Sequence, residues 1–131
     1  MKTHRILVVD DEVALASTVR LHLEDTGRFE VEVANSGTSA LAKGPVFKPD
    51  LVLLDLMMPD MDGSEVAERF SRDPRMAHVP IVFLTAVVAK AEVRAGGDFI
   101  GGRCFLAKPT GARELIACID KRLVEGSVTP R

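Results

Sequence analysis

Short apolar runs alternate along this chain with longer amphipathic stretches, and this alternation limits the possible folds more than any other feature of the sequence. Four runs are nearly continuous in apolar residues, as is typical of strands buried on both faces of a parallel sheet; they cover residues 6–9, 51–54, 81–84 and 104–107. A fifth run, 29–34, alternates apolar side chains with Glu30 and Glu32. That alternation predicts a strand with one wet face, which we place at an edge of the sheet.

Helical periodicity fills the intervals between the runs. Residues 13–24 carry apolar side chains at a spacing of four, and similar stripes cover 64–70 and 115–123. Ser36 is a plausible N-cap for another helix. Clusters of glycine, proline and aspartate predict loops; they lie at 43–45, 59–63 and 73–74.

The segment between residues 87 and 104 fits this pattern less well, because it holds four glycines. Each glycine inside a helix costs about 1 kcal/mol relative to alanine. We therefore expect a short fourth helix at 90–95, followed by a mobile stretch.

The order of elements is five β–α units, which predicts a parallel sheet with right-handed crossovers and helices on both faces, a doubly wound α/β fold. A chain of 131 residues is long enough for one domain with one core. We expect that domain to span residues 1–124, with 125–131 as a C-terminal tail or the start of a linker.

The composition excludes several classes of function. The net charge of −2 leaves no basic field for nucleic acid, so we expect no direct DNA or RNA binding. The apolar run near the N-terminus is too short for a signal peptide or a membrane span. Cys104 and Cys118 form no close metal-ligand pair and are interpreted as reduced thiols of a cytoplasmic protein.

Polar residues follow the strands at the points where the strands end. Asp10 and Asp11 follow the run at 6–9, Asp55 the run at 51–54, Thr85 and Ala86 the run at 81–84, and Lys108 the run at 104–107. In doubly wound sheets, ligands bind at the carboxyl ends of the strands. Three carboxylates at one edge repel one another unless a divalent cation lies among them, and ligand sets made only of oxygen favour Mg²⁺. A lysine and a threonine hydroxyl beside them suit phosphoryl oxygens.

With these motifs in order, the chain resembles the receiver domains of two-component response regulators, of the chemotaxis-regulator-like kind. The matching segments are ILVVDDE, DLVLLDLMMPDMDG, PIVFLTA and FLAKP, and the similarity runs from Arg5 to about Leu123. The resemblance implies a flavodoxin-like sheet of five parallel strands in the order 2-1-3-4-5. It also implies a phosphoacceptor in a phosphorelay, rather than a turnover enzyme.

The resemblance also implies the metal site. Asp11 and Asp55 would bind Mg²⁺ directly, Asp10 mainly through water, and the backbone carbonyl of Met57 would complete the protein ligands.

The roles around the phosphoryl group follow from the same resemblance. Asp55 would attack the phosphohistidine of a sensor kinase. Lys108, Thr85 and the backbone N–H of Ala86 would bind the transferred group. Thr85 would then move toward the phosphoryl group while Phe105 turns inward as a switch.

The expected partners are a sensor histidine kinase or phosphotransfer protein and a downstream protein or output domain. The expected output face comprises the helix at 90–95, the strand at 104–107 and the helix at 115–123, and it is also a possible homodimer interface.

Two other classes remain as alternatives. An aspartyl-phosphate phosphatase or phosphotransferase of the haloacid-dehalogenase pattern places its nucleophile after the first strand, two residues before a second aspartate, and Asp10-Asp11 has a different spacing. A flavin-binding module of the flavodoxin type needs a Ser-, Thr- or Gly-rich phosphate loop after the first strand. The acidic sequence at 10–12 would repel a phosphate there.

Overall fold

The computed structural model describes residues 3–85, 98–100, 103–107 and 111–128, with side chains over 3–84 and 111–124. The strands within these ranges are β1 (His4–Val9), β2 (Phe29–Ala34), β3 (Leu51–Asp55), β4 (Ile81–Thr85), β5 (Asp98–Ile100) and β6 (Arg103–Ala107). The helices are α1 (Val13–Glu24), α2 (Gly37–Phe47), α3 (Gly63–Ser71) and α4 (Ala112–Val128).

The strands form one sheet in the order β2-β1-β3-β4-β6-β5. Neighbours from β2 to β6 are parallel, and β5 pairs with β6 in the antiparallel direction. The predicted parallel α/β sheet is confirmed, and so is the edge position of β2. β5 was not predicted: the sequence suggested a mobile glycine-rich stretch, and three residues are too few to show a strand period.

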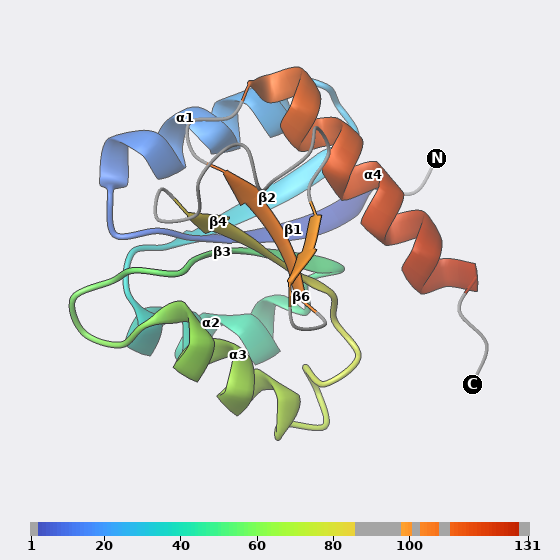
Figure 1. The fold of residues 1–131 in the computed structure, drawn as a ribbon. Helices are drawn as coiled ribbons and strands as arrows, with labels where there is room; N and C mark the ends of the chain where they lie inside the picture. Colours follow the sequence, from blue (N-terminus) through green and yellow to red (C-terminus); the bar gives the residue numbers. More distant parts are fainter. Residues whose placement is uncertain (1–2, 86–97, 101–102, 108–110, 129–131) are drawn as a thin grey trace.

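Helices cover both faces of the sheet, with α1 and α4 on one side and α2 and α3 on the other (Figure 1). Alternate residues of each strand face opposite sides, so Ile6 and Val8 pack in one core cluster with α1 and α4. Leu7 and Val9 pack in a second cluster with α2 and α3. All five residues of β3 are buried, as expected for a central strand covered on both faces.

The helix limits agree with the sequence pattern in part. α1 has the predicted bounds, and Ser36 caps α2 by accepting a hydrogen bond from the Ser39 N–H at 3.0 Å. The expected fourth helix at 90–95 lies outside the described residues. α4 continues to Val128, so part of the expected tail is helical. None of the helices within the described ranges is both long and apolar enough to cross a membrane.

The loop predicted at residues 43–45 is wrong, because α2 continues through Lys43, Gly44 and Pro45 to Phe47. Gly44 faces α3 and allows close packing there: a Cβ at this position would lie 3.0 Å from the ring of Phe70. Pro45 stands in the last turn of the helix and has no N–H to donate to the carbonyl four residues before it. The helix ends at Lys48, whose left-handed conformation has φ 56° and ψ 62°.

Candidate functional site

Three carboxylates meet at the carboxyl edge of the sheet. Val9 of β1 lies opposite Leu54 of β3. The next residue of each segment, Asp10 and Asp55, therefore reaches the same level along the sheet. Asp11 joins them, and ligand oxygens of all three carboxylates lie within 4.8 Å of one another. The sequence prediction that these three side chains gather at one edge agrees with this geometry.

Asp55 is the last residue of β3 and is 5% exposed. Its Oδ1 accepts a hydrogen bond from the Met57 N–H at 3.4 Å. The chain then turns back closely, because the Gly63 N–H donates to the Leu56 carbonyl at 2.8 Å. A Cβ at Gly63 would lie 2.5 Å from the Asp55 carbonyl oxygen, so only glycine fits this close approach of two backbones.

Asp10 is 2% exposed, and Asp11 is more open than Asp10. The Asp10 carboxylate accepts a hydrogen bond from the Glu12 N–H at 2.9 Å, which fixes the turn into α1. On the other side, the Asn35 side-chain amide donates to the Asp10 carbonyl at 2.9 Å. The acidic loop after β1 is thus held by its own backbone and by the residue after β2.

Asp60, in the loop after β3, lies against the beginning of α2. Its carboxylate accepts hydrogen bonds from the N–H groups of Gly37 and Thr38 and from the Thr38 hydroxyl, at 3.0–3.1 Å. The Thr38 N–H, followed by the Gly37 N–H, holds the pKa of Asp60 below its ordinary value of 3.8. The sequence analysis did not identify Asn35 or Asp60, since an exposed polar residue in a loop carries no periodic signal.

The three carboxylates fit a hard divalent cation. All the grouped side chains offer oxygen ligands, two of the three are buried, and the distances between their oxygens suit a single shared ion. Mg²⁺ prefers such ligands and retains several waters. Asp11 is more open than the two buried carboxylates, so one side of this group is accessible to the water ligands of such an ion.

The structure places the other predicted site residues only in part. Thr85 ends β4 one residue beyond Leu84, the partner of Asp55 in the sheet register. Thr85 also lies opposite Ala107, the last residue of β6. Met57 is 60% exposed. Phe105 lies in β6 opposite Phe83, and Ala86 and Lys108 fall outside the described residues.

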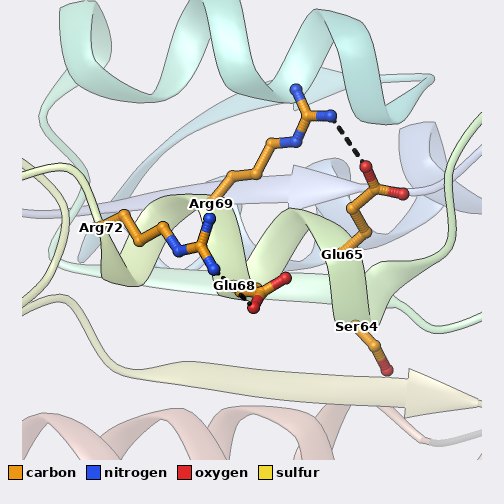
Figure 2. Close-up of a pocket in the computed structure, with 5 residues that line it drawn as sticks. All are labelled: Ser64, Glu65, Glu68, Arg69 and Arg72. Carbon is orange, nitrogen blue, oxygen red and sulfur yellow. Dashed lines mark hydrogen bonds and ion pairs between the residues drawn. The ribbon is translucent and has the colours of Figure 1, made fainter.

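A separate hollow of about 570 Å³ lies on the surface of α3. Figure 2 shows its lining, with Arg69 paired to Glu65 and Arg72 paired to Glu68 at a spacing of four. Exposed pairs of this kind contribute only about 0.3–0.5 kcal/mol each to stability. The lining comes from the exposed face of α3 and from Arg72, the residue that follows it, so this hollow is a solvated helix face rather than a built site.

Comparison with known proteins agrees with this geometry. The family model of the response regulator receiver domain matches residues 6–120. The chain is 40% identical over 119 residues to the DNA-binding response regulator MtrA of Mycobacterium tuberculosis strain H37Rv, covering 91% of this chain and 50% of MtrA. It is 36% identical over 113 residues to the DNA-binding dual master transcriptional regulator RpaA of Synechocystis, covering 86% of this chain and 46% of RpaA.

Solved structures of receiver proteins have the same fold. The chemotaxis response regulator CheY4 of Vibrio cholerae matches with a TM-score of 0.77 and 28% identity, over 93% of this chain and 99% of CheY4. The CheY-like receiver domain protein of Methanospirillum hungatei matches with a TM-score of 0.80 and 26% identity, over 96% and 98% of the two chains. The chain spans about half the length of the curated relatives that it matches, and nearly all of these two structures.

Proposed function

Since the chain belongs to the response regulator receiver domain family of two-component signalling, we propose that Asp55 accepts a phosphoryl group from a sensor histidine kinase or phosphotransfer protein. The observation that carries this proposal is the group of three carboxylates at the carboxyl edge of the sheet. Asp55 stands at the centre of that edge, on a strand that is buried along its whole length. The nucleophile is therefore fixed by the core, while its carboxylate lies among oxygen ligands.

Mg²⁺ is the proposed cofactor. Asp11 and Asp55 would hold it directly, Asp10 through water, and the Met57 backbone carbonyl would complete the protein ligands. When bound, it supplies positive charge that offsets the charge of the phosphoryl oxygens.

Asp55 needs no general base in this step, because an ionised carboxylate attacks through an oxygen lone pair and has no proton to lose. One of its oxygens forms a bond to phosphorus while the bond from phosphorus to the donor nitrogen breaks. The electron pair of that bond goes to the imidazole nitrogen, which takes up a proton from water, so that the histidine leaves in neutral form. The products are an aspartyl phosphate and a free histidine.

The remaining proposed roles concern the transferred group. The Lys108 ammonium, the Thr85 hydroxyl and the Ala86 N–H would bind its oxygens. Thr85 and Phe105 would then link its presence to the output face by changing the balance between two arrangements of that face. Thr85 lies one residue beyond Leu84, the partner of Asp55 in the sheet register, and this position beside Asp55 supports the role proposed for its hydroxyl.

Relatives named as DNA-binding regulators, of which this chain covers about half, suggest the kind of protein in which this domain acts. We propose that nucleic-acid binding in such proteins belongs to their other half. This receiver would act through protein contacts in the cytoplasm, as a signalling domain and not as a turnover enzyme. We further propose that the fold comprises five β–α units, with its fourth helix at 90–95, and that the residues after the end of α4 lead into a tail or linker.

Labelling by a small-molecule donor tests the phosphoacceptor. With acetyl phosphate and Mg²⁺, intact-mass measurement should show one added phosphoryl group on the wild type and none on Asp55→Ala. Chelation of Mg²⁺ should abolish the labelling. Asp50→Asn is the matched control: Asp50 directly precedes β3 at its opposite end, where its carboxylate accepts a hydrogen bond from the Arg5 N–H, and this variant should label like the wild type. Equal labelling of wild type and Asp55→Ala would refute the assignment.

A further inference from the structure

The turn between β2 and α2, residues 34–38, carries no predicted ligand, yet it contacts both loops that carry the ligands. At one end, the Asp10 N–H donates to the Ala34 carbonyl at 3.0 Å, and the Asn35 amide donates to the Asp10 carbonyl at 2.9 Å. Two hydrogen bonds in opposite directions thus fix the backbone of Asp10 to this turn.

The other end of the turn holds the loop after β3. The Asp60 carboxylate accepts three hydrogen bonds from Gly37 and Thr38. Packing supports the same contact, because a Cβ at Gly37 would lie 2.9 Å from the Met61 Cβ. Asp60 lies three residues after Met57, so this contact holds the loop that follows the proposed nucleophile.

We propose that the β2–α2 turn is a bridge that sets the distance between the two acidic loops, with Asn35 and Asp60 as its positioning residues. This inference rests on the proposed function of the site. Three carboxylates at short range repel one another, so the loops need a restraint before a cation arrives. Mg²⁺ requires near-ideal octahedral geometry, and small displacements of its ligands therefore weaken binding. Residues that orient metal ligands affect affinity without touching the ion.

A simpler role for Asp60 is to accept N–H groups in the first turn of α2, beside the N-cap Ser36, and so to stabilise that helix alone. Asp62 gives the matched comparison. It lies in the same loop, is exposed, and caps α3 by accepting a hydrogen bond from the Glu65 N–H at 3.0 Å. Both aspartates accept N–H groups at the beginning of a helix, but Asp62 does so for α3, which directly follows it in the chain, whereas Asp60 joins the loop to the distant helix α2. Loss of a cap alone would lower thermal stability in both variants and leave Mg²⁺ affinity unchanged in both.

The test is a Mg²⁺ titration by calorimetry, well below the unfolding temperature of each variant. Calorimetry is needed because the chain has no tryptophan and no tyrosine as a fluorescent reporter. Asp60→Ala and Asn35→Ala should each raise the Kd for Mg²⁺ about tenfold. Asp60→Asn keeps one acceptor oxygen and should fall between Asp60→Ala and the wild type, while Asp62→Ala should bind like the wild type. Wild-type affinity in folded Asp60→Ala, or an equal loss in Asp62→Ala, would overturn the bridge.

A second measurement needs no metal and separates failure of the bridge from failure of the proposed function. Amide exchange of the metal-free protein should become faster at residues 10–13 when Asp60 is replaced, and at residues 56–61 when Asn35 is replaced. Asp62→Ala should not affect residues 10–13. The bridge is refuted if replacing Asp60 leaves the exchange of residues 10–13 unchanged and replacing Asn35 leaves that of residues 56–61 unchanged. If the exchange couples the loops but the wild type binds no Mg²⁺, the bridge stands and the proposed cofactor fails.

Discussion

At the scale of single residues, the candidate site depends on one close approach of backbones. Gly63 begins α3 while its backbone lies against the carbonyl of Asp55 and the Cα of Leu56. Since neither neighbour is the movable end of a side chain, an added methyl group displaces the loop that carries the Met57 carbonyl. The position of this glycine therefore affects both stability and the site.

Gly63→Ala is expected to destabilise the fold by about 1–3 kcal/mol, the usual cost of overpacking. It should also slow phosphorylation of Asp55 by acetyl phosphate. Urea unfolding and intact-mass labelling measure the two effects. Gly111→Ala is the control, because the nearest atom to a Cβ there is a side-chain oxygen of Glu114 at 3.9 Å. Equal stability of the Gly63 and Gly111 variants would contradict the steric explanation.

The residues of the carboxylate group could be predicted because each follows a recognisable strand, and parallel strands bring their ends together. Asp10, Asp11 and Asp55 are close for that reason, while their chemical roles stay predictions. Asn35 and Asp60 could not be found in this way. Their contacts join residues 25 and 23 positions apart in the sequence. Hydrogen bonds between loops depend on a tertiary arrangement that no local pattern encodes.

At the scale of elements, α2 shows how tertiary packing overrides local propensity. Lys43-Gly44-Pro45 has the composition of a loop, yet it is helical. Gly44 allows close contact with Phe70 and Met76 of the opposing segment, and that packing outweighs the helix propensity lost at one glycine. The helix ends at Lys48, a residue with a Cβ that adopts the left-handed conformation and donates its N–H to the Gly44 carbonyl at 2.9 Å.

Lys48→Gly should therefore stabilise the protein. The left-handed conformation costs a residue with a Cβ about 1–2 kcal/mol, and the extra freedom of glycine in the unfolded chain offsets about 0.5–1 kcal/mol of that gain. A net increase of about 0.5 kcal/mol in the free energy of unfolding is expected from the difference. Urea unfolding with an unchanged m-value measures it.

The same substitution at Lys121, an exposed position inside α4, serves as the control. There glycine should lose about 1 kcal/mol, because it weakens a helix interior. If Lys48→Gly and Lys121→Gly lower the free energy of unfolding by similar amounts, the conformation of Lys48 carries no strain.

At the scale of the whole molecule, consecutive strands of the sheet, β3, β4 and β6, connect the site to the proposed output face. Asp55 is on β3, Thr85 ends the neighbouring β4, and Phe105 is on β6 beyond it. A change at Asp55 can reach the output face through adjacent strands alone. β2, on the far side of β1, takes no part in that route.

Beryllofluoride with Mg²⁺ mimics the phosphoryl group and should change amide exchange in β4, β6 and α4. The amides of residues 29–33 in β2 should exchange at the same rate in both states, which makes that part of the strand an internal reference. Hydrogen exchange followed by mass spectrometry gives both values in one experiment. Identical protection of β4, β6 and α4 with and without the mimic would contradict the proposed switch, while leaving Asp55 as a candidate phosphoacceptor.

Among the residues whose side chains the structure describes, the two core clusters on opposite faces of the sheet share no member. Substitutions that repack one cluster should thus combine additively with those that repack the other. For the history of such a domain, this means that the α1–α4 side and the α2–α3 side can diverge separately. One side can acquire a new partner while the other keeps an old one, with Asp55 held unchanged between them.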